Sequence, residues 1–148
     1  MPKHHQTLDV PYTPDQLFEL VSDISRYPEF IKWIKALRVS SPKQYGPLHS
    51  CVGEAVVGFK GFTESFSTSV EAQSEQRTVS VNLVRGPFRK LANNWQFSDN
   101  GQGGAIIDFR IDYEFSNFVL RALASANRDV AIELIMAAFL DEAKRRYA

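Results

Sequence analysis

The chain has 148 residues, of which 44% are apolar and 23% are charged, so it is globular rather than disordered. Its 17 lysines and arginines balance 17 aspartates and glutamates, which excludes a nucleic-acid protein held by bulk charge alone. The single cysteine, Cys51, excludes an internal disulfide. There is no signal-peptide pattern, linker or apolar run of about 18 residues. We therefore expect one domain, residues 1–148, in the bacterial cytoplasm.

The first elements are a strand and a short helix. Residues 3–10 alternate like a strand. Thr13 followed by Gln16 forms a capping-box pattern, which predicts a helix starting directly afterwards. Pro28 predicts that this helix ends before Tyr27, because the residue before a proline disfavours the helical region. The apolar positions of the helix share one face: Leu17, Leu20, Val21 and Ile24.

The middle of the chain alternates with period two, which predicts antiparallel strands with one wet face. A loop is expected over residues 40–47, where Pro42, Gly46 and Pro47 interrupt the pattern, and Asn100-Gly101 indicates a hairpin. The apolar sets are Leu37 and Val39; Ala55, Val57 and Phe59; Phe62, Phe66 and Val70; Val79, Val81 and Leu83; Leu91, Trp95 and Phe97; and Ile107, Phe109, Ile111, Tyr113 and Phe115.

The C-terminal fifth of the chain reads as one long helix. Residues 117–147 contain no glycine or proline, and Ser116 is the expected cap. Between Val130 and Leu140 only Glu133 is charged, so this helix should be buried on more than one side. The order of elements favours an α+β fold in which a curved antiparallel sheet wraps around one long helix.

Metal binding and nucleophilic catalysis are poorly supported. His4 and His5 are adjacent, so on a strand they point to opposite faces. His49 and Cys51 have no evident third group to orient them as a catalytic pair. We interpret Cys51 as a structural thiol.

Acid–base chemistry is also weakly indicated. Asp108, Asp112 and Glu114 fall on the polar face of their strand, where solvent explains them. Asn93 is the polar exception on an apolar face, and we interpret it as an amide whose hydrogen bonds are satisfied within the core. What remains is the aromatic and aliphatic stripe itself, which predicts an apolar pocket beside the helix.

Four sets of segments, taken in chain order, resemble a known family. They are residues 10–13 with 18–24 and 26–30; GPFRKL at 86–91 with 95–97; DYEFSN at 112–117; and 138–139 with 143–147. In this order they resemble the coenzyme Q-binding START-like proteins, a family that includes the bacterial ribosome-association toxins of the RatA branch. The resemblance covers nearly the whole chain. It implies the helix-grip fold of the START/Bet v 1-like superfamily, with about six to seven strands around a long C-terminal helix.

The first functional hypothesis is a non-enzymatic carrier. The resemblance implies ubiquinone or another lipid as the bound ligand, no cofactor, a role in respiration and transient contact with the inner membrane surface. Phe88, which lies among three cations in the sequence, and Phe118, at the start of the long helix, are predicted to form the mouth of the pocket. The residues predicted to line it are Val57, Phe59, Phe66, Val81, Trp95, Phe109, Tyr113, Leu123 and Val130.

Two further hypotheses stay open. In the second, the chain binds the large ribosomal subunit, with no role for DNA, through Arg85, Arg89 and Lys90 and through the basic helix end at 144–146. The same three cations would also suit a membrane surface. In the third, the chain is an enzyme of the cyclase or hydratase type, and Asn93 or Tyr113 is essential.

Overall fold

The computed structural model describes residues 3–59 and 61–147, without the side chains of residues 59, 62, 120 and 123–131. Its strands and helices follow one another along the chain in the order that the sequence predicts. The elements are β1 Lys3–Val10, α1 Pro14–Ser22, a 3₁₀ turn Ile24–Arg26, α2 Tyr27–Phe30, β2 Ile34–Tyr45, β3 Leu48–Phe59, β4 Phe62–Gln73, β5 Thr78–Arg85, β6 Phe88–Asp99, β7 Ala105–Phe115 and α3 Phe118–Tyr147.

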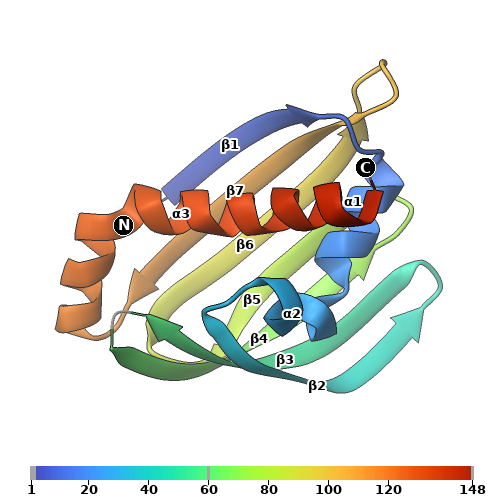
Figure 1. The fold of residues 1–148 in the computed structure, drawn as a ribbon. Coiled ribbons are helices and arrows are strands. Elements are labelled where there is room, and N and C mark those ends of the chain that lie inside the picture. The colour runs from blue at the N-terminus through green and yellow to red at the C-terminus, as the bar shows by residue number, and fades with distance from the viewer. Residues whose placement is uncertain (1–2, 60, 148) are drawn as a thin grey trace.

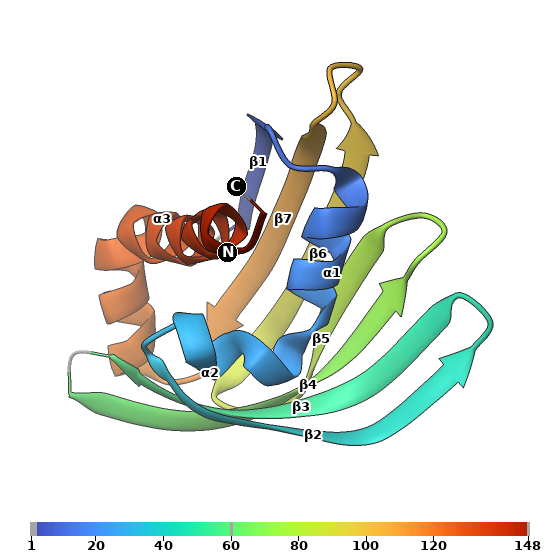
Figure 2. The same cartoon turned by 45° about the vertical axis from the view of Figure 1, so that its right-hand side comes forward.

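The strands form one sheet of seven in the order β1-β7-β6-β5-β4-β3-β2, and every neighbouring pair is antiparallel. The sheet is strongly curved, and α3 crosses its inner face (Figures 1 and 2). The predicted α+β architecture, a curved antiparallel sheet around a C-terminal helix, is therefore confirmed. In both views the first turns of α3 run at an angle to the rest, where the sequence predicted one continuous helix without a bend.

The start of α1 follows the sequence prediction closely. Gln16 N donates to Thr13 Oγ1 at 3.1 Å, and Thr13 N donates to Gln16 Oε1 at 2.9 Å, which closes the capping box. The face of α1 that was predicted from its spacing is buried, and α1 closes one end of the sheet (Figure 2).

One predicted break in secondary structure is wrong, at Pro42, and the other, before Tyr27, is confirmed. Residues 40–45 are not a loop: β2 continues to Tyr45, with a bulge near Ser41 (φ 52°), and only Gly46 and Pro47 turn the chain. Pro42 is tolerated because β2 is an edge strand, where a missing N–H need not break the ladder. The helix α1 ends at Ser22, and Tyr27 begins the separate short helix α2, where Pro28 stands in the first turn and its missing donor has no partner to lose.

The predicted cap of α3 is also displaced by one residue. Val119 N donates to Asn117 Oδ1 at 2.7 Å, so Asn117 rather than Ser116 caps the first turn. Asparagine fills this role as well as serine does, and sequence preference alone does not separate two adjacent candidates.

Candidate functional site

Strand register defines the inner face of the sheet. One row of paired positions runs across it as Ala72, Val79, Trp95 and Phe109. The next row toward the far end is Val70, Val81, Asn93 and Ile111. The apolar sets expected from alternation are therefore brought together on the side of the sheet that α3 covers.

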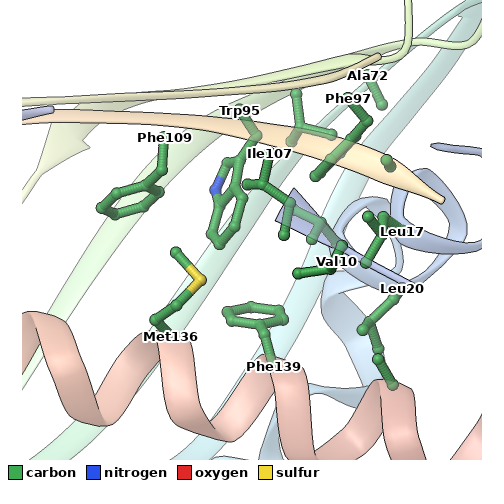
Figure 3. Packing of buried hydrophobic residues seen from close by; sticks show 14 of the residues in the cluster. Val10, Leu17, Leu20, Ala72, Trp95, Phe97, Ile107, Phe109, Met136 and Phe139 are labelled. Carbon is green, nitrogen blue, oxygen red and sulfur yellow. The ribbon is translucent and has the colours of Figure 1, made fainter. Parts of the chain in front are cut away.

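One half of this face is tightly packed, and we call it the packed half. Trp95, Phe97 and Phe109 are only 4%, 2% and 2% exposed. Met136 and Phe139 of α3 point at Trp95 and Phe109 from the helix (Figure 3). The Trp95 ring lies 5.1 Å from that of Phe139 and 4.7 Å from that of Phe109, between ring centroids. Trp95 and Phe109, predicted to line a pocket, are thus part of a filled core.

Asn93 sits beside this core with both ends of its amide occupied. Its Nδ2 donates to the carbonyl oxygen of Arg110 at 2.8 Å, and Trp95 Nε1 donates to its Oδ1 at 2.9 Å. The amide therefore orients the indole and ties β6 to β7, as the interpretation of Asn93 as a satisfied core amide expects.

Ion pairs stabilise the outer end of the packed half. Glu142, near the end of α3, is 4% exposed and accepts from Arg145 Nε at 2.8 Å and from Arg146 Nε at 2.7 Å. Arg146 also lies 5.7 Å over the ring of Phe30 in α2. The hydrogen bond from Arg145 is the main cause that lowers the pKa of Glu142 to about 2, so this carboxylate is ionised at neutral pH.

The other half of the inner face, which we call the open half, is only partly covered. Phe88 stacks on Phe115 with 4.6 Å between centroids and meets Phe66 edge-on at 5.4 Å. Phe115 in turn lies 6.0 Å from Tyr113, which is 8% exposed. The half-buried apolar side chains of this half are Val57, Phe66, Val81, Leu83, Phe88, Leu91, Ile111 and Phe115.

The predicted lining residues divide between the two halves. Val57, Phe66 and Val81 are half-buried in the open half, and Tyr113 borders it. Of the two mouth residues, Phe88 is folded inward on its aromatic neighbours, whereas Phe118 is 75% exposed at the start of α3. The remaining three predictions concern side chains outside the described part of the chain: Phe59, Leu123 and Val130.

The sequence analysis missed a carboxylate on the inner face. Glu64 pairs with Val57 in the β3–β4 register, so it points to the same side as Val57 and Phe66. Its side chain is partly buried at the end of the open half. The sequence did contain a signal for it: in a strand whose side chains alternate, Glu64 lies on the same face as Phe62 and Phe66.

The three cations proposed for ribosome or membrane contact are not equivalent. Lys90 Nζ lies 2.5 Å from Asp112, and Arg89 lies 3.9 Å from Glu114. Arg85 is exposed and makes no ion pair with any residue that the structure describes. Arg89 and Lys90 thus have acidic partners on the outer face, each carboxylate being shared with a second cation, Arg121 on Glu114 and Lys3 on Asp112, whereas Arg85 has no acidic partner among the described residues.

Other chemistry finds little support in the described residues. Burial raises the pKa of the Cys51 thiol, the opposite of what activates a nucleophile. Among residues 3–59 and 61–147, no three histidine, cysteine or acidic side chains gather as a metal site. No helix in that part of the chain is long and apolar enough to cross a membrane.

Comparison with known proteins places the chain in a family. Residues 10–140 match the family described as polyketide cyclase / dehydrase and lipid transport, and the chain belongs to this family. The ribosome association toxin RatA of Escherichia coli K12 is 32% identical over 151 residues, covering 100% of this chain and 90% of the toxin. The mitochondrial coenzyme Q-binding protein of Schizosaccharomyces pombe is 28% identical over 142 residues, covering 93% and 84% of the two chains.

Solved structures confirm the helix-grip fold. An 18 kDa protein from Caulobacter crescentus superimposes with a TM-score of 0.81 at 37% identity, over 98% of this chain and 97% of the other. A START superfamily protein from Mycobacterium smegmatis gives 0.77 at 17% identity, over 97% of each chain. The Zhui aromatase/cyclase from a Streptomyces species superimposes with a TM-score of 0.81 at 13% identity, over 99% of this chain and 96% of the other. At that identity the likeness shows a shared fold and nothing about activity. The resemblance to START-like proteins is thus confirmed.

Proposed function

We propose that this chain binds an isoprenoid quinone, or a lipid of similar shape, on the open half of its inner face. The observation that carries the proposal is the row of inward-facing apolar side chains, from Val57 to Phe115, that α3 leaves partly exposed. The name of the coenzyme Q-binding relative supports this ligand class. The open half offers apolar side chains of the kind that contact such ligands.

The driving force would be burial of apolar surface on both sides. Each Å² removed from water contributes about 25 cal/mol, reduced by the entropy lost when ligand and protein associate. Phe66, Phe88 and Phe115 supply edge and face contacts suited to a quinone ring, while Val57 and Val81 suit an isoprenoid tail.

We propose further that the chain is not an enzyme. Asn93 is the polar residue that an acid–base mechanism would use. Its amide donates to the carbonyl oxygen of Arg110 and accepts from the indole N–H of Trp95. Among the described strand residues, Glu64 and Asp99 hold inward register positions, but they lie at opposite ends of the sheet, and Asp99 is exposed and accepts from Gly101 N. They therefore do not form an acid–base pair. Substitution of Asn93 should therefore change stability rather than a reaction rate.

The first test is extraction of the purified protein with organic solvent, followed by mass spectrometry for isoprenoid quinones. The second is titration of the stripped protein with a short-tailed ubiquinone, comparing Val81→Trp with the matched control Val84→Trp. Val81 is half-buried on the inner face, whereas Val84 is 56% exposed. We expect Val81→Trp to lower affinity at least about tenfold because it fills the site, and Val84→Trp to leave it unchanged. Equal affinity in both variants would contradict the proposal.

A second candidate function is association with the large ribosomal subunit. It is favoured by the 32% identity to the RatA toxin across the whole of this chain. The exposed cation Arg85 and the basic end of α3 would carry the contact. Co-sedimentation with purified large subunits at low salt should be seen and should weaken as salt rises. Absence of co-sedimentation at low salt would exclude this function.

A further inference from the structure

A separate hollow lies on the outer face of the sheet, where β2, β3, β4 and β5 meet. It has a volume of about 350 Å³. Leu37, Ala55 and Phe66 contribute atoms to it, although their side chains point to the inner face. Because side chains alternate along a strand, the residues next to them in the sequence point to the outer face. The outward side chains around it include Arg38, Glu54, Val56, Ser65, Ser67 and Arg85.

A β-bulge brings Arg85 to this hollow. Thr68 pairs with Leu83, but the next residue, Ser67, pairs with Arg85, so Val84 is an extra residue in β5. Without the bulge Arg85 would point to the inner face with Leu83, because side chains two apart share a face. The bulge instead places the guanidinium opposite Ser67, at the edge of the hollow.

The turn after Arg85 fixes this position. Gly86 has a φ of 154°, and a Cβ there would collide with the Cβ of Phe66. Only glycine lets the chain pass so close over β4. The backbone that carries Arg85 is thereby held directly against the strand that carries Ser65 and Ser67.

Two further features suit an anion. Arg38 is paired with Glu54 at 3.5 Å, so the carboxylate of the hollow is already balanced, and Arg85 has no acidic partner among the described residues. Ser67 is 5% exposed, yet its hydroxyl makes no hydrogen bond with any described residue. The Ser67 Oγ atom itself remains reachable by solvent, so this hydroxyl is available to donate to a bound anion.

We propose that this outer pocket binds the phosphate group of a small molecule. The Arg85 guanidinium and the hydroxyls of Ser65 and Ser67 donate to the phosphate oxygens, and Val56 contacts the rest of the ligand. A volume of about 350 Å³ matches a small-molecule site. A nucleic-acid backbone would need several unpaired cations spread over a surface, and here Arg85 stands alone. The site opens on the opposite face of the sheet from the proposed quinone site, and Phe66 contributes to both.

The test is an NMR titration of the full chain with inorganic phosphate, against sodium chloride at equal ionic strength. We expect saturable amide shifts at residues 65–67 and 85, and an affinity about 10- to 100-fold lower in Arg85→Gln. The control is Arg110→Gln, which removes an exposed outer-face arginine of β7 and should leave the affinity unchanged. Absence of saturation, or equal binding by the two variants, would overturn the proposal.

Two additional arms separate the alternatives. Ser67→Ala should lower phosphate affinity without lowering the free energy of unfolding, because the hydroxyl has no partner in the described chain to lose. A loss of stability with unchanged phosphate affinity would instead mean a purely structural serine and count against the site. A short oligouridylate is the final probe: if it shifts these amides while inorganic phosphate does not, the surface recognises nucleic acid and the small-molecule proposal is wrong.

Discussion

The packed and open halves of the inner face are built from the same strands but end in different states. In the packed half, Trp95 of β6 and Phe109 of β7 are nearly inaccessible to water. A few residues along the same two strands, Leu91 and Phe115 remain half-buried. Met136 and Phe139 of α3, together with α1, cover the packed half (Figure 3). The packed half supplies stability, and the open half is the surface proposed for binding.

This division resolves a conflict that any small apolar carrier faces. A chain of about 150 residues needs a filled core for its stability, while a ligand site needs apolar surface that is left uncovered. Here Phe139 serves the first need through edge contacts with Trp95, Tyr27 and Phe30 at 5.1, 5.2 and 5.5 Å. The half-buried trio of Phe66, Phe88 and Phe115, whose rings pack on one another, is the surface proposed for the second.

The largest effect should come from truncating an aromatic ring in the packed half. Phe139→Ala should lower the free energy of unfolding by about 3–5 kcal/mol, because it leaves a cavity among rings that cannot collapse. Phe66→Ala, in the open half, should cost about 1–2 kcal/mol, since that ring is only half-buried. Urea unfolding of both variants measures the difference.

Phe139→Leu is the control for this comparison, since it keeps most of the buried volume and should cost less than Phe139→Ala. If Phe66→Ala proves as damaging as Phe139→Ala, the division into a packed and an open half is wrong. If Phe66→Ala is mild in stability but reduces quinone affinity, the division and the proposed site are both supported.

A smaller effect is expected at the buried carboxylate of the packed half. Glu142→Gln should cost about 2 kcal/mol at pH 7, because hydrogen bonds to a charged group are lost. Glu114, on the outer face of the open half, is 3.9–4.0 Å from Arg89 and Arg121 and more exposed, so Glu114→Gln should cost no more than about 0.5 kcal/mol.

The pH dependence of Glu142→Gln provides a second readout. The folded protein lowers the pKa of Glu142 from 4.5 to about 2, so its contribution is complete above pH 4.5 and disappears as pH falls through 2. The gap in unfolding free energy between the wild type and Glu142→Gln should therefore be constant from pH 7 to 5 and close on acidification. A gap that does not change with pH would show that Glu142 acts only by packing.

Much of the fold could be predicted because its signals are local and periodic. The capping box at Thr13 and the alternation of β7 each specify their element within a few residues, and the structure confirms both. The errors arose where tertiary placement overrides a local preference. Pro42 is accepted because β2 happens to be an edge strand, and no signal within residues 40–47 states where the strand will lie in the sheet.

The candidate site was less predictable, for a physical reason. Alternation tells which side chains face inward, but it does not tell how far along the sheet the helix will cover them. Trp95 and Val81 therefore looked alike in the sequence, although one is packed against Phe139 and the other is half-buried. The bulge that turns Arg85 outward depends on strand pairing between Ser67 and Arg85, and no local pattern in β5 predicts it.

The smallest effects should come from the two helix caps, which sharpen the comparison further. Thr13→Ala removes the capping box of α1 in the packed half and should lower the global unfolding free energy by about 1 kcal/mol. Asn117→Ala removes the hydrogen bond to Val119 N at the start of α3, beside the open half. If the cover of the open half opens independently of the core, this variant should speed hydrogen exchange in the first turn of α3 while changing global stability by less than Thr13→Ala does. Equal losses of global unfolding free energy in the two variants would mean that the first turn of α3 unfolds together with the core. The open half would then be less tightly packed than the core but would not unfold independently of it.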